Sequence, residues 1–385
     1  IPKFSRVVSR EEIRSNDYNL NIPRYVDSSE AAEHWDVYAS MFGGIPTAEI
    51  DEMSEFWTAF PALKKALFTE SGIPYVDVSV DDIKSAIKSH PDVVGFENAF
   101  NAAFSTFPAF LKEELIDRMG SIEISKAETV LSADIFERLK EIPLIDKYAA
   151  FQLLDDDWTG ISIDLEMLQT EGFAATKKVD PNLVIKKKDG KDQEVQEGWV
   201  GHIIPFDLVQ ATLLSAETDE LHGLESRLAE IPSEYESILD EMTEEDKESC
   251  NDVLTEEGDA FVPKEVSKKI KELKKDRSPE SVALRTLLEK VESLVKSEKE
   301  IKAEIKAKSA ALQAKTKDTI ESLSDEQALD LLEKKSIAPL IESIHKLPDT
   351  VIDSLVSKIQ ALQNKYATTF FEVEQQISET EATLS

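Results

Sequence analysis

The chain has 385 residues, of which 44 are Lys or Arg and 77 are Asp or Glu, so its formal net charge is −33. Apolar residues make up 41% of the chain, which excludes a wholly disordered protein, and the length allows two or three domains of ~100–200 residues each. The single cysteine, Cys250, excludes an intramolecular disulfide framework and a zinc site built from several cysteines.

The composition favours helices and a reducing compartment. Only 12 glycines occur, while Glu, Lys, Leu and Ala are abundant. No apolar run approaches the ~18–20 residues that a membrane-spanning helix needs, so we expect a soluble, cytoplasmic protein with no membrane partner. Ile1 is not a start methionine, which suggests a piece of a longer protein.

Motifs of the common active-site classes do not occur. The five histidines never stand three to five residues apart, so no helical pair of metal-binding histidines exists. There is no Gly-x-x-x-x-Gly-Lys-Ser/Thr loop, no Gly-x-Gly-x-x-Gly turn and no Gly-x-Ser-x-Gly elbow. Cys250 stands in an acidic run that should raise the pKa of its thiol. We therefore predict no catalytic, cofactor-binding or metal-binding residue in this chain.

The one dense carboxylate cluster is Asp155-Asp156-Asp157, directly before Trp158. It could hold Mg²⁺, or it could be a solvated helix end. Adjacent residues on a helix point in different directions, so we favour the solvated helix end.

In chain order, residues 1–29 differ in character from the remainder of the chain, and Ser9 to Glu12 form a capping box for a brief helix. Residues 30–215 are predicted to be a helical domain. Its phenylalanines at four-, four- and three-residue spacing could line a ligand site, but such a stripe is more typical of a buried helix face. These are Phe96, Phe100, Phe104 and Phe107.

A β-hairpin is predicted near residues 181–203. Leu183-Val184-Ile185 and the later Val195 to Val200 flank Asp189-Gly190, and Asp-Gly between two strand-like runs is a strong hairpin signal.

Six lysines lie within the fifteen residues 177–191. They could contact phosphates of DNA, or they could protect the edges of the strands, and the sequence leaves both alternatives open. The resulting DNA-contact candidates are Lys186, Lys187, Lys188 and Lys191.

Residues 216–277 are predicted to be an acidic and then basic helical connector. Residues 217–259 hold 17 acidic and 2 basic side chains, which favours a solvated face over docking to a basic partner. Residues 264–277 hold seven basic and three acidic ones, and this helix could follow a nucleic-acid backbone or face the acidic segment.

Residues 278–385 are predicted to form a coiled-coil arm. Ser278-Pro279 is a helix start, and an apolar heptad-like series over 281–315 is interrupted by Glu298 and Lys308. A second series comes after a connector of two short helices, and it comprises Ile352, Leu355, Ile359, Leu362, Tyr366 and Val373. The fold class is therefore mainly α, with a helical domain, one small β-hairpin and a long antiparallel coiled-coil helical hairpin.

Several short motifs resemble a known family. Residues 19–27 (Asn-Leu-Asn-Ile-Pro-Arg-Tyr-Val-Asp), preceded by Asn-Asp-Tyr, resemble the segment that closes the methyltransferase domain in modification subunits of type I restriction–modification systems. Further similar motifs occur in the family's order, and they lie within 38–46, 57–68, 144–148, 157–158, 203–209, 323–326 and 365–368.

This resemblance implies DNA adenine-N6 methylation with S-adenosylmethionine, in a complex with a specificity subunit and a restriction subunit on double-stranded DNA. The family's Asn-Pro-Pro-aromatic motif and glycine-rich cofactor loop are absent here, so no catalytic residue carries over. The resemblance thus implies the non-catalytic region C-terminal to the catalytic domain, with 1–29 as that domain's closing segment. We expect this chain alone to bind no S-adenosylmethionine and to show no methyltransferase activity.

By the same resemblance, the chain would assemble with the specificity subunit and help to hold DNA. Arg24, inside the opening motif, is a further DNA-contact candidate. Phe370, Phe371 and Tyr366 are candidates for docking to the partner, because aromatic residues often dominate interface energies.

Two alternatives stay open. The chain could be a stand-alone coiled-coil scaffold that shares short motifs by coincidence. It could also be an enzyme that uses Asp155 to Asp157 with a metal, which is the weaker hypothesis.

Overall fold

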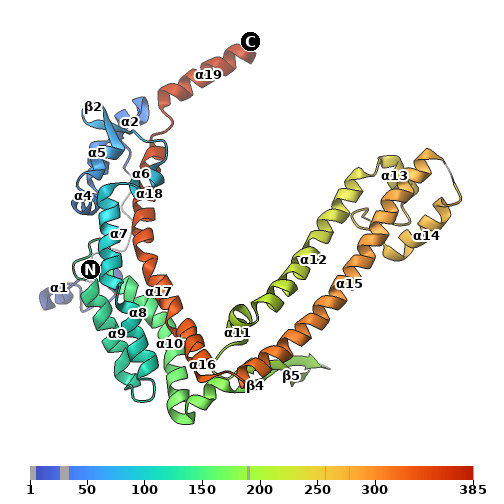
Figure 1. Cartoon of the computed structure of the whole chain (residues 1–385). Coiled ribbons are helices and arrows are strands. Elements are labelled where there is room, and N and C mark those ends of the chain that lie inside the picture. Colours follow the sequence, from blue (N-terminus) through green and yellow to red (C-terminus); the bar gives the residue numbers. More distant parts are fainter. Residues whose placement is uncertain (1–5, 27–33, 189–190, 256, 277, 385) are drawn as a thin grey trace. The chain divides into compact units, whose positions relative to one another are not determined.

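The structure is a computed structural model, and it describes residues 6–26, 34–188, 191–255, 257–276 and 278–384. It is mainly α-helical with small antiparallel sheets, which confirms the predicted class (Figure 1). The chain falls into two compact units: unit 1 comprises Ile1–Phe100, Ile142–Ile145 and Pro348–Ser385, and unit 2 comprises Asn101–Glu141 and Asp146–Leu347. Within the described ranges, no helix combines the length and the apolar character that crossing a bilayer requires.

Unit 1 is built from short elements and two C-terminal helices. Ser9 begins the first helix as predicted, since its side chain accepts a hydrogen bond from the Glu12 amide. The elements are α1 (Arg10–Ser15), η1 (Ile22–Arg24), α2 (Val37–Phe42), β1 (Ile45–Pro46), α3 (Thr47–Asp51), α4 (Ser54–Ala59), α5 (Leu63–Leu67), β2 (Phe68–Gly72), β3 (Tyr75–Val78), α6 (Ile83–Lys88), the start of α7 (Pro91–Phe104), α18 (Leu347–Lys365) and α19 (Phe370–Leu384).

The core of unit 1 forms where α18 packs against the short helices of residues 39–96. Ile352, Leu355 and Ile359 are fully buried on one side of α18, and they pack with residues such as Phe60 and Leu63. Burying a side chain of this size stabilises a fold by about 1.5–3 kcal/mol. This cluster therefore joins α18, near the C-terminal end of the chain, to the N-terminal part of the chain.

Unit 1 also contains a three-stranded antiparallel sheet in the order β1-β3-β2. The prediction of a single β-element missed it. The strands are two to five residues long, and β2 buries only Phe68, so the sequence shows no alternating pattern there. A strand this short is defined by its partners, here by pairs such as Ile45 with Val76.

Unit 2 holds the longer helices and the β-hairpin. Its elements are α8 (Phe107–Lys112), the π-helical turn η2 (Glu113–Asp117), α9 (Ile124–Arg138), α10 (Lys147–Glu171), η3 (Phe173–Lys177), β4 (Val179–Lys188), β5 (Lys191–Gly201), α11 (Phe206–Leu213), α12 (Ser215–Glu241), α13 (Glu244–Ser249), α14 (Pro263–Leu273), α15 (Pro279–Glu321), α16 (Asp325–Ser336) and α17 (Ala338–His345).

The predicted phenylalanine stripe is buried, which confirms its assignment to the core. Phe96, Phe100, Phe104 and Phe107 are at most 6% exposed. The Arg138 guanidinium lies over the Phe107 ring at 5.2 Å and donates to the Ala103 carbonyl at 2.7 Å. A cation thus closes the end of this apolar stripe in unit 2.

A long two-helix arm is formed by α12 and α15, which run side by side (Figure 1). The Ser278 hydroxyl caps α15 as predicted, and the 43 residues of α15 span about 65 Å at 1.5 Å per residue. At one end of the arm, α13 and α14 close a core around the fully buried Cys250, Leu288 and Val291.

The predicted pairing of the 281–315 helix with the second apolar series is wrong. The apolar series of α15 packs against α12 and α14, and that of α18 packs into the core of unit 1. The physical reason is that a heptad-like series specifies a buried helix face and not its partner. The polar interruptions of α15 are matched by α12: Glu298 accepts from the Tyr235 hydroxyl at 3.2 Å, and Lys308 pairs with Glu220 at 2.5 Å.

Candidate functional site

The predicted β-hairpin is confirmed as the antiparallel pair β4 and β5. Its turn, Asp189-Gly190, lies outside the described residues. A register shift near Asn182 marks a bulge, where the Asn182 side-chain amide donates to the Glu197 carbonyl at 3.2 Å. Gly198 stands beside it at φ +77°, a conformation that favours glycine.

Of the lysines predicted to contact DNA, Lys186, Lys187 and Lys188 lie on β4 and Lys191 begins β5, and two of them face carboxylates on β5. Lys186 forms an ion pair with Glu197, and Lys187 stands opposite Asp192 in the ladder. Lys188 pairs with Lys191 in backbone register, and the side chains of these two residues lie outside the described part. The hairpin is therefore less electropositive than the lysine count alone indicates.

Arg24, the remaining DNA-contact candidate, ends η1 in unit 1 and is exposed. The structure does not bring it together with the hairpin lysines in one unit, because the hairpin belongs to unit 2.

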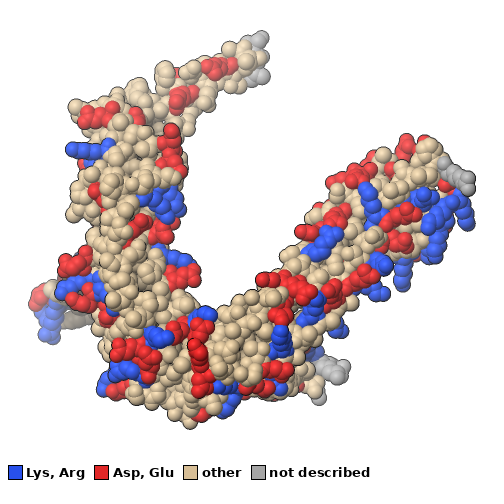
Figure 2. Space-filling view, viewed as in Figure 1, with Lys and Arg blue, Asp and Glu red and all other residues tan. Residues whose placement is uncertain are grey.

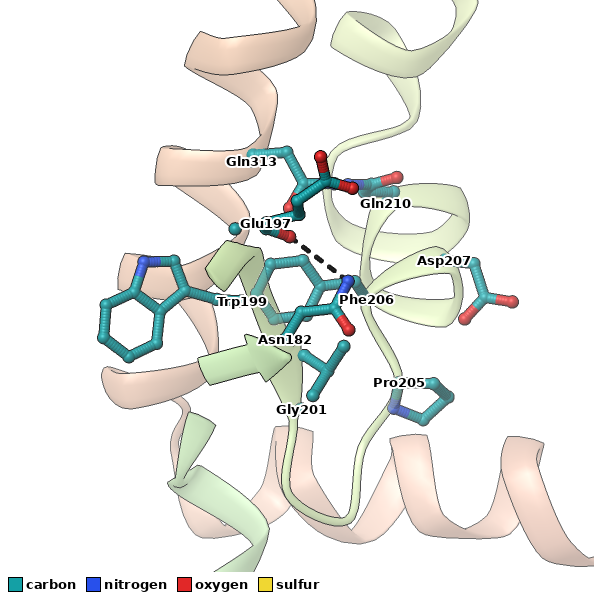
Figure 3. A pocket seen from close by; sticks show the side chains of 11 residues that line it. Asn182, Glu197, Trp199, Gly201, Pro205, Phe206, Asp207, Gln210 and Gln313 are labelled. Carbon is teal, nitrogen blue, oxygen red and sulfur yellow. Dashed lines mark hydrogen bonds between the residues drawn. The ribbon is translucent and has the colours of Figure 1, made fainter. Parts of the chain in front are cut away.

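A pocket of about 660 Å³ lies at the base of the hairpin, between β4–β5, α11 and α15 (Figure 3). Asn182, Gln210 and Gln313 supply side-chain amides, and Phe206 supplies an aromatic wall. The Trp199 ring points away from the pocket centre and is covered by the Lys317 ammonium at 4.2 Å. This pocket can bind a planar polar group through amide hydrogen bonds and stacking.

The turn after the hairpin is held in a fixed position within unit 2. A Cβ on Gly201 would stand 1.7 Å from the Ile204 carbonyl oxygen, so only glycine fits there. The Lys335 ammonium donates to the Ile203 carbonyl at 2.7 Å and pairs with buried Asp164. Burial raises the pKa of the Asp164 carboxyl against the opposing effect of Lys335. The hairpin thus projects from a fixed base.

His202 links the root of the hairpin to the end of α10. Its Nδ1 lies 2.6 Å from Asp180 Oδ2, and its Nε2 lies 3.0 Å from Glu171 Oε1. Lys178 pairs with the same Glu171 at 2.6 Å. The hydrogen bond to Asp180, with a further contribution from that to Glu171, raises the pKa of His202 despite its partial burial.

Replacing His202 with Gln should cost most stability at low pH. Because the folded-state pKa is raised above the unfolded value near 6.5, the stabilisation by protonated His202 is fully present below about pH 6.5 and is lost as pH rises through the folded-state pKa. Melting curves between about pH 5.5 and pH 8.5 should show that the variant is less stable than the unchanged chain at low pH and that this difference in stability becomes smaller as the pH rises. His222→Gln, on the exposed side of α12, is the control. A difference that stays constant with pH would contradict this role of His202.

Unit 1 exposes a group of aromatic rings around the junction of α2 and α19. We define the aromatic surface as Trp35, Tyr38, Phe42, Phe370 and Phe371, which are all more than half exposed. Tyr38 stacks on Tyr75 with ring centroids 4.8 Å apart. An exposed group of this kind is typical of an interaction site. A polar pocket of about 710 Å³ adjoins it.

Tyr366, predicted as a docking residue, is instead buried at 4% exposure. Its hydroxyl donates to Glu49 and accepts from the Asp36 amide at 3.1 Å, and Lys365 pairs with the same Glu49 at 2.8 Å. Burial, and then Glu49, raises the pKa of Tyr366. Tyr366 therefore supports the aromatic surface from below, and Phe370 and Phe371 are the exposed members of the predicted set.

The acidic triplet and the cysteine also have defined places in unit 2. Asp155 to Asp157 lie inside α10 and not at a helix end. Burial, and then the negative charge of Asp156, raises the pKa of Asp157.

Burial, more than the acidic neighbours, raises the pKa of the Cys250 thiol. Among the described residues, no group of three His, Cys, Asp or Glu side chains could hold a metal ion.

The basic segment after residue 263 faces the acidic segment on one side. Lys269 of α14 pairs with Asp252 at 3.1 Å. Other lysines of this segment are exposed and form no ion pair with a described residue. These are Lys264, Lys271, Lys274 and Lys275. Figure 2 shows blue side chains gathered over the part of the arm where Figure 1 labels α14.

Comparison with known proteins gives one family match. A family model described as N-6 DNA Methylase matches residues 1–34. Neither a curated protein nor a solved structure matches the chain. The match includes the motif at residues 19–27 and supports a relationship to the N6 DNA methylases.

Proposed function

We propose that this chain is the non-catalytic, C-terminal region of the modification subunit of a type I restriction–modification system. The observation that carries the proposal is the N-6 DNA Methylase match over residues 1–34, which coincides with the motif resembling the end of the methyltransferase domain. The parent enzyme would use S-adenosylmethionine to methylate adenine N6. In this proposal the present chain serves assembly with the specificity and restriction subunits and helps to hold DNA.

Mass spectrometry of the native gene product tests this assignment. The proposal requires a product much longer than 385 residues, with an Asn-Pro-Pro-aromatic motif before Ile1. A native product of 385 residues would instead support a stand-alone scaffold.

The aromatic surface supports the assembly role. Its rings combine large apolar area with few rotatable bonds, which suits anchors in an interface. Acidic side chains of α19, including Glu372 and Glu374, surround Phe370 and Phe371, so the docking face of the specificity subunit should be apolar with a basic rim.

The β-hairpin supports the DNA-holding role. A two-stranded ribbon fits the major groove of B-DNA, and lysines on it can contact phosphates. To contact DNA, Lys186 would have to leave its ion pair with Glu197 and bind a phosphate, so its net contribution to DNA affinity is smaller than that of an unpaired lysine. The strong negative charge of the rest of the chain should keep the isolated chain from binding DNA tightly.

We expect Lys186→Gln and Glu197→Gln to change DNA binding in opposite directions. In the assembled complex, loss of Lys186 should reduce the slope of log affinity against log salt by about 1, because one phosphate contact disappears. Loss of Glu197 should tighten binding, because Lys186 is released from its ion pair. Fluorescence anisotropy with duplex DNA across salt concentrations measures both effects.

Lys140→Gln is the matched control. It removes one charge from an exposed lysine that follows the end of α9 and pairs with Glu137 at 3.4 Å. The decisive variant replaces Lys186, Lys187, Lys188 and Lys191 together with Gln. If its salt slope equals that of the Lys140→Gln control, the lysines only protect the strand edges.

A further inference from the structure

A second pocket, of about 300 Å³, lies on the two-helix arm near α14. Its walls are the rings of Tyr235 and Phe261, whose centroids are 6.3 Å apart, and the apolar side chains of Leu239 and Val295. Tyr235 and Leu239 come from α12, Val295 comes from α15, and Phe261 precedes α14. The pocket is therefore formed only when these elements pack together.

Every charged residue that lines this pocket in the described part is acidic. Glu236 comes from α12, Asp259 from the segment before α14, and Glu298 from α15. Glu236 and Asp259 form no ion pair with another described residue, although Asp259 accepts from the Thr255 hydroxyl at 2.6 Å. Two of the three carboxylates that line the pocket thus have no cationic partner in the described chain.

Glu298, the third carboxylate, is held in place by two contacts. Its Oε2 accepts from the Tyr235 hydroxyl at 3.2 Å, and its Oε1 pairs with Lys302, which does not line the pocket. Burial, and then Glu298, raises the pKa of Tyr235 to about 12, so this phenol keeps its proton and its neutral ring. An aromatic face and a fixed carboxylate therefore stand side by side.

We propose that this pocket binds an arginine side chain from a basic segment of a partner protein. The aliphatic stem fits the Leu239 and Val295 walls, and the guanidinium can stack on the rings. Its planar fork of five donors suits a pocket that is lined by more than one carboxylate better than the compact ammonium of a lysine does. The acidic segment 217–259 attracts a basic segment from a distance. This proposal is independent of the function proposed above.

The test uses the full chain with labelled methyl groups and the probe N-acetyl-arginine-N-methylamide. Methyl NMR should show saturable shifts at Leu239, Val295 and Ala260, and no shifts at Leu331 or Ile344, which are buried elsewhere in unit 2. The citrulline analogue has the same shape without the charge, so it should bind about tenfold more weakly or worse.

Glu298→Gln should weaken arginine binding by about tenfold, since it removes one negative charge from the pocket lining but keeps an acceptor for Tyr235. Glu300→Gln, two residues along α15 and paired only with Lys296 among the described residues, is matched in charge and should leave binding within about twofold. Melting curves of both variants confirm that they fold.

Several results would overturn the proposal. Equal binding of the arginine and citrulline probes would indicate a neutral site, and preferential binding of a norleucine probe would indicate an apolar occupant. Equal loss in Glu298→Gln and Glu300→Gln would indicate general charge attraction. Tighter binding of a lysine probe, or no shift at any pocket methyl, would also contradict it.

Discussion

Replacing Phe370 and Phe371 together with Ala is expected to weaken assembly with the specificity subunit by about 30-fold or more. The two rings are 62% and 63% exposed at the start of α19, so the chain itself does not bury them. Anchoring aromatics at interfaces often contribute about 2 kcal/mol or more, and about 1.4 kcal/mol corresponds to a factor of ten in affinity. A quantitative pull-down of the specificity subunit measures the loss. The melting temperature of the isolated chain should hardly change.

The matched control is the pair Val130→Ala and Ile163→Ala. These apolar residues are 46% and 51% exposed on α9 and α10, and both belong to unit 2, whereas the aromatic surface belongs to unit 1. This control should leave both assembly and stability unchanged. If the double Phe variant loses stability but assembles normally, the rings contribute to the fold and the docking surface lies elsewhere.

Replacing Leu355 with Ala should lower the free energy of unfolding by about 2–5 kcal/mol, the range for a fully buried leucine. The side chain is 0% exposed and packs in the core of unit 1, so its removal leaves a cavity. Denaturant unfolding monitored by circular dichroism measures the change.

Val373→Ala is the informative comparison, because Val373 belongs to the same apolar series in the sequence but is 39% exposed on α19. Its replacement should change the free energy of unfolding by less than about 0.5 kcal/mol. Equal costs at Leu355 and Val373 would mean that the whole series forms one buried seam, as a coiled coil requires.

Local signals in the sequence predicted local structure well. The hydroxyl of Ser278 caps α15, and that of Ser9 accepts a hydrogen bond from the Glu12 amide at the start of α1. Both signals act within three residues of the chain, so they need no tertiary partner. The Asp-Gly turn predicted the hairpin for the same reason.

Tertiary partners were not predictable in this way. The acidic run that suggested a solvated connector is α12, whose Ile231 and Ile238 are buried, because its charges occupy the other faces of the helix. The burial of Tyr366 depends on Glu49, more than 300 positions away, and a single sequence gives no sign of that contact.

The candidate site was predicted in part. The hairpin lysines were found from their density. Lys187 and Asp192 stand opposite each other close to the turn, whereas Glu197 lies beside the bulge and is not directly opposite Lys186, so the ion pair of Lys186 with Glu197 does not follow from the turn. Tyr38 and Phe42 were noted only as parts of a resembling motif. Their exposure next to α19 could not be inferred, since exposed and buried aromatics have the same spacing in short helices.

The continuity of α15 gives unit 2 a mechanical property. Its interior contains neither glycine nor proline, whereas α12 contains Gly223 and Pro232. Kinks occur mainly at such residues, so α15 is the stiffer rod of the two. It contacts α14 near Leu288 and the hairpin near Lys317, two points about 45 Å apart along its axis. A stiff helix therefore fixes the distance between the α14 core and the β-hairpin within this unit.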